Sequence, residues 1–375
     1  MKILHISSSR ITYPGGGEKI VLDMARESSK RHDVTVLQTT INEDDVPFKK
    51  EDVIDGIKVI TCKNDRWLGG FGYSKGFKKV LKNIWKDYDV VHIHGHGRFT
   101  SFFAFQFLKD KLPIVYTPHG FFHTNKFYFI KKIHDLFYNK LIKYSTYFIA
   151  LSELDKQKFM KIGIPEKKIE IIPNFINIKE FRMKSNRTSF LKKYGLNPKN
   201  KTILCLGRIH KSKSLQYVVE AVKDLDVNLI IAGRDVGFVD VLKRKISDLK
   251  IGGRVKIIGE VSSKNRLKCY ANCDIFILFS QWEGFGIVMI EAMAAGLPVI
   301  VSDRGPLPTI VKDGKNGLVA KFPDVRSLKE KISMLIRDKK LYDKIKLNEK
   351  RFVKRFDTEK VVKRIEELYG KAVKG

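Results

Sequence analysis

Two carboxylates in one short segment, Glu283 and Glu291, have the spacing and surroundings of a site for a sugar and a phosphate. Glu283 lies just before a Gly-Phe-Gly loop, and Glu291 lies in an apolar, alanine-rich helix predicted from about Gly286 to Gly296. A glycine loop before a helix leaves free backbone N–H groups at the positive end of the helix dipole, which suits a phosphate. Ionised carboxylates accept hydrogen bonds, so each can bind hydroxyl groups. The segment therefore predicts one carboxylate before a phosphate site and another one turn beyond it.

A second interpretation of this segment needs no ligand. It consists of a buried helix, an ordinary glycine turn and two solvated acids, and the spacing alone does not exclude it because acids are common. Glu291, however, stands among Ile290, Ala292 and Met293 in a helix that is apolar almost all round. A buried carboxylate without a partner is costly. The apolar helix and the glycine loop together favour a binding site.

A second glycine-rich loop, at residues 15–17, follows the first predicted strand and precedes a helix. It lacks the third glycine of the dinucleotide fingerprint, because Ile20 stands there, and no lysine-serine pair of a P-loop follows. A simple turn and a phosphate-binding loop both remain open for Gly16 and Gly17. Its position after a strand favours the phosphate.

Histidines form a second group of candidate site residues. His92, His94 and His96 alternate along a predicted strand and are expected to share one face, with His119 and His123 downstream. A metal cluster is one interpretation, but we expect no bound metal. His119 follows a proline at a strand end, where open α/β sheets place ligand contacts. An ordinary structural histidine is the alternative there.

Six segments, in order along nearly the whole chain, resemble motifs of the retaining glycosyltransferase family 4. They are residues 13–18 (Tyr-Pro-Gly-Gly-Gly-Glu), 116–120 (Tyr-Thr-Pro-His-Gly), 171–177 (Ile-Ile-Pro-Asn-Phe-Ile-Asn), Gly207-Arg208 with Lys213, the Glu-x7-Glu segment 283–291, and 313–319 (Asp-Gly-Lys-Asn-Gly-Leu-Val). Each motif is weak alone, and their common order makes the resemblance strong. It implies the GT-B fold, in which two Rossmann-like, doubly wound parallel-sheet domains face each other across a cleft.

The resemblance also implies a role for each donor-site residue. Glu291 would hold the ribose hydroxyls of a nucleotide-diphosphate sugar, and Glu283 the donor sugar. Backbone N–H groups of the residues around the start of the helix would hold the diphosphate: Phe285, Gly286, Ile287 and Val288. The family implies no metal and no other cofactor.

Arg208 and Lys213 are expected to neutralise the leaving diphosphate. Arginine offers a planar fork of donors and lysine a mobile point charge, so the two can meet a diphosphate from two sides. Cations at this position favour the transition state as charge develops. The family usually has glycine after this lysine, whereas this chain has Ser214, which puts the backbone geometry of the loop in doubt.

In the first domain, the resemblance implies that His119 lies at the donor sugar and supports a hydroxyl or the nascent charge. The loop with Gly16 and Gly17 would close over the donor phosphates and the acceptor. We therefore expect His119, Glu283, Arg208 and Lys213 to be the catalytic residues.

Alternating apolar strands and amphipathic helices predict βαβ units, parallel sheets and an α/β fold. The strands are expected at 2–7, 33–38, 90–94, 114–116, 148–151 and 170–172, and again at 202–206, 229–232, 255–258, 275–278 and 299–301. The pattern restarts after a polar stretch at 184–201, so we expect an acceptor domain over 1–180 and a donor domain over 181–357. The resemblance adds that the last helix, within 358–375, packs back on the first domain.

The net charge of the chain and its distribution indicate which kinds of partner the protein binds. The net charge is +31, with +10 in residues 1–180 and +21 in 181–375. Candidate partners of this charge are the anionic donor, an anionic membrane surface and nucleic acid; a solvated basic surface without a partner is the alternative. Basic and aromatic residues alternate over 125–144, which suits either a lipid or acceptor surface or a helix with its aromatic residues packed inward. That segment matches no nucleic-acid recognition motif, so we expect no nucleic-acid partner.

No apolar run in the sequence is long enough to span a bilayer, and the first residues are typical of a strand rather than a signal peptide. The four cysteines are expected to be ordinary thiols. We therefore predict a cytoplasmic protein, peripheral on the inner face of the membrane.

The expected function is transfer of a sugar from a UDP- or GDP-linked donor to a hydroxyl of a glycolipid, lipid-linked or polysaccharide acceptor. Two other classes of function remain open. One is a nucleotide-sugar epimerase or phosphorylase on a similar fold, and the other is a non-enzymatic polyanion-binding protein.

Overall fold

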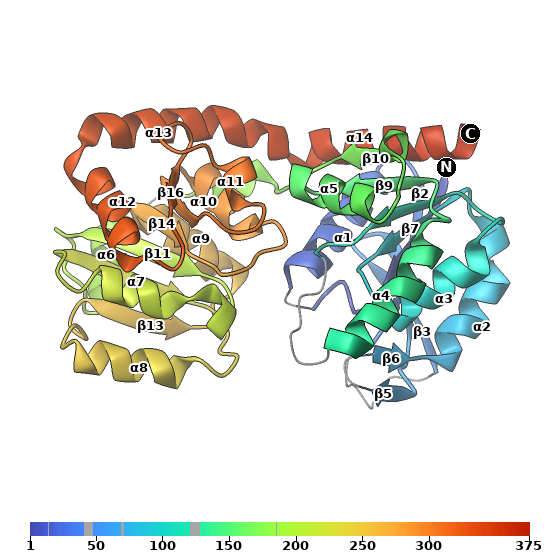
Figure 1. The fold of residues 1–375 in the computed structure, drawn as a ribbon, viewed down its shortest axis with the longest axis horizontal. Coiled ribbons are helices and arrows are strands. Elements are labelled where there is room, and N and C mark those ends of the chain that lie inside the picture. Colours follow the sequence, from blue (N-terminus) through green and yellow to red (C-terminus); the bar gives the residue numbers. More distant parts are fainter. Residues whose placement is uncertain (14, 41–47, 69–70, 121–127, 185) are drawn as a thin grey trace. The chain divides into compact units, whose positions relative to one another are not determined.

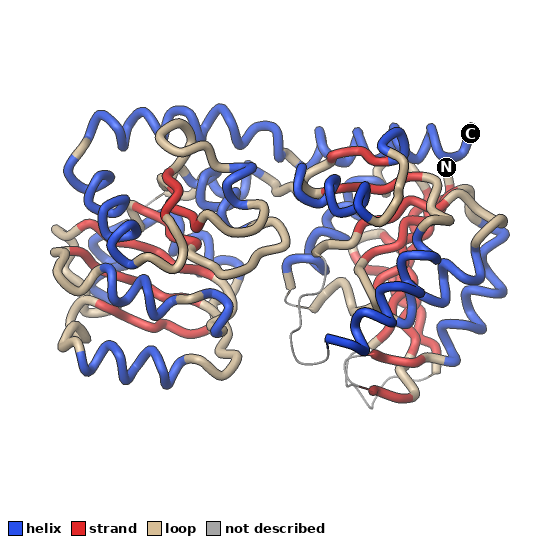
Figure 2. The backbone as a smooth tube through the Cα atoms, viewed as in Figure 1, coloured by secondary structure: helices blue, strands red, loops and turns tan. Residues whose placement is uncertain are grey.

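The computed structural model describes residues 1–375 except 14, 41–47, 69–70, 121–127 and 185. It divides into two compact units, Met1–Phe175 with Thr358–Gly375, and Ile176–Asp357. The boundary lies a few residues before the one expected from the sequence. Strands and helices alternate along most of each unit (Figure 2).

The first unit is built on an eight-stranded sheet with the order β10-β9-β8-β7-β1-β2-β4-β3. Its strands are β1 (Lys2–Ser7), β2 (Asp33–Thr39), β3 (Lys49–Ile54), β4 (Ile57–Cys62), β7 (Val90–His94), β8 (Ile114–Thr117), β9 (Tyr147–Ala150) and β10 (Ile169–Ile171). All neighbouring strands pair in parallel except β3 and β4. A short hairpin, β5 (Arg66–Leu68) and β6 (Phe71–Tyr73), stands apart.

Helices cover the first sheet in two groups (Figure 1). One group contains α1 (Gly16–Ser28) and α14 (Thr358–Lys374), which contact each other. The other contains α2 (Lys75–Ile84), α3 (Phe99–Leu108), α4 (Tyr128–Ile142) and α5 (Glu153–Lys161), with short 3-10 turns at Trp85–Asp87 and Glu166–Lys168. The chain therefore returns to the first sheet through its last helix.

The β3–β4 hairpin was not predicted from the sequence. Its turn is formed by Asp55 and Gly56, both with positive φ (52° and 80°). Asp-Gly with this backbone is a strong signal for a two-residue hairpin. The alternation of β3 is hard to recognise because the strand is a largely exposed edge.

The second unit has a fully parallel six-stranded sheet with the order β13-β12-β11-β14-β15-β16. Its strands are β11 (Lys201–Leu206), β12 (Val227–Ala232), β13 (Val255–Gly259), β14 (Ile275–Leu278), β15 (Val299–Ser302) and β16 (Leu318–Ala320). Its helices are α6 (Arg187–Lys193), α7 (Leu215–Ala221), α8 (Val239–Asp248), α9 (Ser263–Asn272), α10 (Ile287–Ala295), α11 (Leu307–Ile310), α12 (Val325–Arg337) and α13 (Lys339–Phe352). Single 3-10 turns occur at Ile178–Phe181, Lys211–Lys213 and Val353–Phe356.

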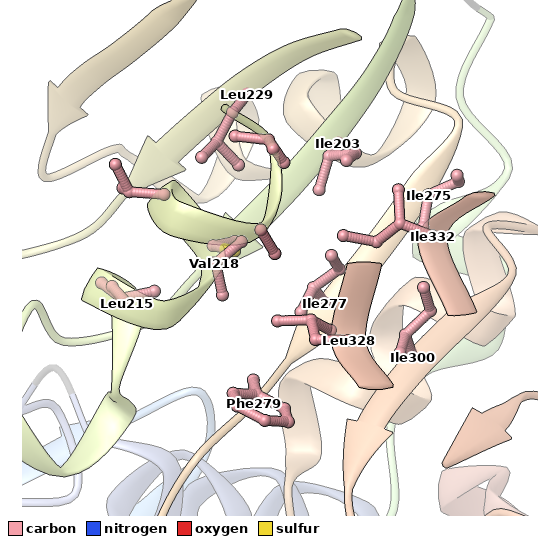
Figure 3. Close-up of a cluster of buried hydrophobic side chains, with 14 of the residues drawn as sticks. Ile203, Leu215, Val218, Leu229, Ile275, Ile277, Phe279, Ile300, Leu328 and Ile332 are labelled. Carbon is pink, nitrogen blue, oxygen red and sulfur yellow. The ribbon is translucent and has the colours of Figure 1, made fainter. Parts of the chain in front are cut away.

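The core of the second unit holds these strands in place. Apolar side chains from the strands, among them Ile203, Leu229 and Ile300, meet Val218 of α7 and Leu328 of α12 (Figure 3). All five are fully buried. This packing makes the ends of β11 and β14 a rigid base for the loops that follow them.

Candidate functional site

The site of the second unit forms where the strand order of its sheet reverses. β11 pairs with β12 on one side and with β14 on the other, so the loops after β11 and β14 diverge from neighbouring strand ends. Ligands of open α/β sheets bind in the crevice at such a switch point. The two loops carry Arg208, Lys213 and Glu283, and a backbone hydrogen bond from Gln281 N to Ser212 O (2.9 Å) joins them.

Lys213 and Glu283 form an ion pair in this crevice. The Lys213 ammonium lies 2.5 Å from Glu283 Oε1, which also accepts a hydrogen bond from Ser280 Oγ at 2.8 Å. The side chains are only 18% and 10% exposed, so the pair is partly shielded from water. The sequence expected these residues to bind the diphosphate and the sugar respectively. The structure brings them together and adds Ser280, which the sequence did not indicate.

Arg208 lies on the same pocket without contacting this pair. The pocket is lined by residues that include Arg208, Lys213 and Ser280. The Arg208 guanidinium is exposed, and the described part of the chain offers it no ion-pair partner. One paired and one free cation therefore border this pocket, which suits a polyanionic ligand.

The backbone around Arg208 requires glycine at two positions. Gly207 and Gly233 have φ of 143° and 148°. A Cβ atom on Gly233 would lie 1.7 Å from the carbonyl oxygen of Gly207. A side chain at Gly233 would block this approach, whereas Gly207 is constrained by its positive φ alone.

Ser214 occupies a position that favours glycine. Its φ is 55°, in the left-handed region, between the 3-10 turn Lys211–Lys213 and α7. The serine therefore adopts the backbone conformation that glycine adopts more easily. The doubt raised by the missing glycine is answered for this loop, since Lys213 still reaches Glu283.

α10 agrees closely with the helix expected from the sequence. It runs from Ile287 to Ala295, with Gly286 (φ 90°) before it and Gly296 (φ 80°) after it. No side chain caps its first turn, so the N–H groups at its start, including those of Ile287 and Val288, remain available to a ligand. Phe285, just before the helix, is buried and does not itself face water.

Glu291 is buried, with 1% exposure, and its carboxylate has protein partners on both oxygens. Arg266 Nη1 lies 2.6 Å from Oε1, and the Tyr270 hydroxyl donates to Oε2 at 2.9 Å. Burial first, and the Glu291 charge second, raise the pKa of Tyr270 well above its usual value. Arg266 and Tyr270 occupy one face of α9, four residues apart, and the sequence analysis missed both. Because a buried carboxylate without a partner is costly, the apolar surroundings of Glu291 in the sequence indicated that a cation must lie near it.

The first unit holds a second cluster, centred on His119. This residue follows β8 with a left-handed φ of 51°. A Cβ atom on Gly17 would lie 3.9 Å from His119 Cβ, so the first glycine loop passes beside the histidine. Gly16 begins α1 in the same loop.

His119 belongs to a chain of hydrogen-bonded histidines. Its Nε2 lies 2.9 Å from His94 Nδ1, and His94 Nε2 lies 2.9 Å from His5 Nδ1. His92 bonds instead to the Tyr369 hydroxyl (2.6 Å) and to Thr117 Oγ1 (2.8 Å). His5 was not recognised from the sequence, although it lies beside His92 in the β1–β7 register.

The expectation that three alternating histidines share one face was wrong for His96. β7 ends at His94, and Gly95 turns the chain with φ 88°. His96 Nδ1 consequently contacts the Tyr116 hydroxyl (2.9 Å), on the face opposite to Thr117 and His92. His123 lies outside the described residues.

His5, His92, His94 and His119 are neutral at physiological pH. Burial lowers the pKa of His5 to about 3 and that of His119 to about 4. Burial also lowers the pKa of His92 and His94 well below the usual value. Ring nitrogens of His5, His92 and His94 lie within 4.8 Å of one another. Each nitrogen of His92 and His94 already has a protein hydrogen-bond partner.

The expected site residues therefore fall into two groups, each within one unit. Arg208, Lys213, Glu283, Glu291 and the start of α10 belong to the second unit, and His119 with the glycine loop belongs to the first.

Comparison with known proteins places both units in one enzyme family. Residues 14–180 match the family described as Glycosyltransferase Family 4, and residues 186–352 match Glycosyl transferases group 1. The GDP-mannose:cellobiosyl-diphosphopolyprenol alpha-mannosyltransferase of Xanthomonas campestris is 24% identical over 389 residues, covering 100% of this chain and 97% of that protein. The N-acetyl-alpha-D-glucosaminyl L-malate synthase of Bacillus anthracis is 27% identical over 293 residues, covering 75% and 74%.

The fold is shared with solved structures at low sequence identity. The crystal structure of Anabaena HepE in complex with UDP matches with a TM-score of 0.82 and 21% identity, covering 99% of this chain and 100% of that one. The two sequence matches leave only short segments of the chain uncovered. The chain thus belongs to the family 4, group 1 glycosyltransferases and has their GT-B fold.

Proposed function

We propose that this enzyme transfers a sugar, with retention of configuration and without a metal, from a UDP- or GDP-linked donor to a hydroxyl of a glycolipid, lipid-linked or polysaccharide acceptor. The observation that carries the proposal is the crevice lined by Arg208 and Lys213, where Lys213 pairs with Glu283, with the uncapped start of α10 following Glu283 closely in the chain. Relatives support the substrate classes: one is named for a GDP-mannose donor and a diphosphopolyprenol-linked acceptor. A structural neighbour was solved with UDP.

The donor roles follow from chemistry and burial. Backbone N–H groups at the start of α10 hold the diphosphate, as helix N-termini do, with Arg208 and Lys213 supplying positive charge. Lys213 is shared between the diphosphate and Glu283, and Glu283 accepts hydrogen bonds from the donor sugar. Glu291 holds the ribose hydroxyls, and Arg266 and Tyr270 fix the position of its carboxylate.

The reaction proceeds on one face of the donor sugar. The bond between the anomeric carbon and the diphosphate oxygen breaks, and the electron pair leaves with the diphosphate. The acceptor oxygen then bonds to the same face, and its proton passes to a phosphate oxygen. Arg208 and Lys213 stabilise the negative charge that develops, which is the role a divalent cation has in other transferases.

The enzyme acts at the cytoplasmic face of the membrane in this proposal, because its acceptor class includes lipid-linked glycans and its surface is basic. Among the described residues, no helix combines the length and apolarity needed to cross a bilayer. α4 buries Tyr138 and Ile142, while Leu136 and Phe137 on the same helix are 59% and 57% exposed. Exposed Lys140 stands beside them. Apolar side chains flanked by lysine suit the interface of an anionic membrane.

Release of nucleoside diphosphate tests the transferase proposal. A panel of UDP-, GDP- and ADP-sugars is offered with a metal chelator and a lipid extract as acceptor. We expect release from one nucleotide only, abolished by Glu291→Ala and by Lys213→Ala, and anomeric NMR of the product should show retention. Inversion, or loss of activity with the chelator, would contradict the corresponding part of the proposal.

The same panel separates the alternative functions. An epimerase would consume donor without releasing nucleoside diphosphate, and a phosphorylase would require orthophosphate. A polyanion-binding protein would release nothing from any donor, and its binding would survive Glu291→Gln.

Vesicle flotation tests whether the exposed apolar side chains of α4 bind an anionic membrane. We expect Leu136→Ser with Phe137→Ser to reduce binding to anionic vesicles. Met160→Ser, on α5 and also exposed (44%), gives a matched control. Equal loss in both variants would contradict a specific role for α4.

A further inference from the structure

The histidine chain has two unpartnered ends. His119 Nδ1 and His5 Nε2 are buried and have no hydrogen-bond partner in the described structure, whereas the inner nitrogens pair at 2.9 Å. All three rings are neutral, because burial lowers their pKa. A neutral imidazole carries one proton, so each ring has one donor and one acceptor nitrogen.

These hydrogen bonds allow only two proton arrangements. In the first, all three rings carry the proton on Nδ1: His5 donates to His94, His94 donates to His119, and the Nδ1–H of His119 is free. In the second, all three carry it on Nε2, the donations reverse, and the free N–H belongs to His5. The tautomer of His119 is therefore tied to that of a residue two rings away.

The surroundings of the two ends favour the first arrangement. His5 is fully buried (0% exposed) on the central strand β1, with His92 and Tyr369 rings beside it. A free N–H there would lack an acceptor, which is costly in a protein interior. His119 Nδ1 is also buried in the free protein, but His119 follows the carboxyl end of β8 and lies beside Gly17, at the edge of the sheet where ligands bind, so an oxygen of a bound ligand can accept its proton.

We propose that His94 and His5 are positioning residues that hold His119 as the Nδ1–H tautomer, so that His119 donates a hydrogen bond to an oxygen of the bound substrate. The inference rests on the proposed function, in which His119 lies at the donor sugar. It adds the direction of the hydrogen bond: His119 is a donor there and does not act as a base. Free histidine in water favours the opposite, Nε2–H form, so the chain reverses an intrinsic preference.

Nitrogen NMR on the free protein tests this directly. Long-range proton–nitrogen spectra of the ¹⁵N-labelled enzyme distinguish the two neutral tautomers, and single substitutions assign the nine histidines. We expect Nδ1–H for His119, His94 and His5. An Nε2–H or cationic His119, or stoichiometric transition metal in the purified protein, would overturn the proposal.

Two variants of His94 test whether the chain is the cause. His94→Phe keeps a ring but removes both nitrogens, so His119 should lose its fixed tautomer, and kcat/KM should fall about fivefold for one weakened hydrogen bond. His94→Asn places an amide N–H near the former Nδ1 and should restore the Nδ1–H form of His119. An Nδ1–H His119 in the Phe variant would overturn the role of the chain.

Tyr369→Phe is the matched control, because it removes the hydrogen bond to His92 and leaves the three-ring chain intact. It should change neither the tautomer of His119 nor kcat/KM. The tautomer is read without substrate, so failure of the transferase assay and failure of the histidine proposal are distinguishable.

Discussion

Lys213 and Glu283 form an ion pair with each other, and this pairing fixes where each charge lies in the crevice. A lysine that binds only a diphosphate could be replaced by any nearby cation. Here the 2.5 Å contact with Glu283 and the hydrogen bond from Ser280 fix the positions of both charges. In the proposed function, this pairing couples recognition of the sugar by Glu283 to recognition of the diphosphate by Lys213.

This coupling predicts strongly non-additive kinetics. Lys213→Ala should lower kcat by about 10²–10³-fold, because it removes transition-state charge stabilisation. Glu283→Gln should cost a similar factor, and the double variant should cost little more than either single one. Steady-state release of nucleoside diphosphate measures all three. Lys329→Ala, which breaks the exposed Lys329–Asp224 pair of the same unit, serves as the control and should leave kcat unchanged.

The buried histidines predict a loss of stability in acid. Burial lowers the folded-state pKa of His119 to about 4 and that of His5 to about 3, below the ordinary value of 6.5. The unfolded chain therefore binds more protons below pH 6.5, and stability is lost as pH falls from there toward the folded pKa values. Each such histidine contributes a slope of about 1.4 kcal/mol per pH unit. Burial raises the pKa of Glu349, which acts in the opposite sense and offsets part of this slope.

Urea midpoints at a series of pH values between 4 and 7 measure that slope. His94→Phe removes one buried histidine and should flatten the curve by about one proton. An unchanged slope in this variant would contradict the assignment of the protons to the cluster.

At the scale of elements, the glycine before α10 is constrained by both its backbone conformation and its neighbours. Gly286 has φ of 90°, and a Cβ atom there would lie 3.0 Å from Leu307 Cδ2 and 3.1 Å from Leu278 Cδ2. The residue therefore has two constraints, a left-handed backbone and a tight apolar surrounding.

Gly286→Ala should reveal both constraints. We expect a loss of about 2–3 kcal/mol in unfolding free energy, from the left-handed backbone and from displaced apolar side chains, together with weaker nucleotide binding. Gly314→Ala is the matched control, because Gly314 also has positive φ (69°) but nothing lies within 4 Å of its Cβ position. It should cost about 1–2 kcal/mol and leave binding unchanged. Equal effects in both variants would show that packing around Gly286 is unimportant. Denaturant unfolding and nucleotide titration measure the two quantities.

At the scale of the molecule, the last helix is part of the first unit. α14 buries Val362, Leu368 and Tyr369, and Arg31 binds the Glu366 carboxylate through two nitrogens at 3.0 and 3.1 Å. The second unit, by contrast, is one continuous stretch of chain from 176 to 357. The stability of the first unit therefore depends on residues that follow the second unit in the chain.

Deletion of residues 358–375 should unfold the first unit and spare the second. Several buried side chains worth about 1.5–3 kcal/mol each are lost with the helix. Thermal unfolding of this deletion variant should then show only the transition of the second unit. A protein consisting of residues 176–357 alone should show the same transition. Deletion of residues 373–375 only, all exposed, is the control and should change neither unit. A surviving first transition in the longer deletion would contradict the role of α14.

Much of the fold and the second-unit site could be predicted from the sequence, because local signals carried them. The glycines at 286 and 296 marked the ends of α10, and their positive φ values explain why glycine stands there. Alternating strands and helices indicated two doubly wound sheets. The Asp-Gly turn of the β3–β4 hairpin was an equally local signal that was overlooked.

The partners of the site residues could not be predicted, because they come from distant segments. Arg266 of α9 forms an ion pair with Glu291 of α10. His5 forms a hydrogen bond with His94 only because β1 and β7 are neighbours in the sheet. His96 left the expected face because β7 ends two residues before it, at His94, a matter of tertiary contact.

By itself the sequence determined the family and the α/β class and indicated candidate residues for binding a sugar and a phosphate, since these depend on residue type and short spacing. Only the tertiary structure decided which charges pair, which carboxylate is buried and how the three histidines of the chain arrange their protons. Hydrogen bonds and burial depend on distances between strands and helices far apart in the chain, which no local pattern specifies.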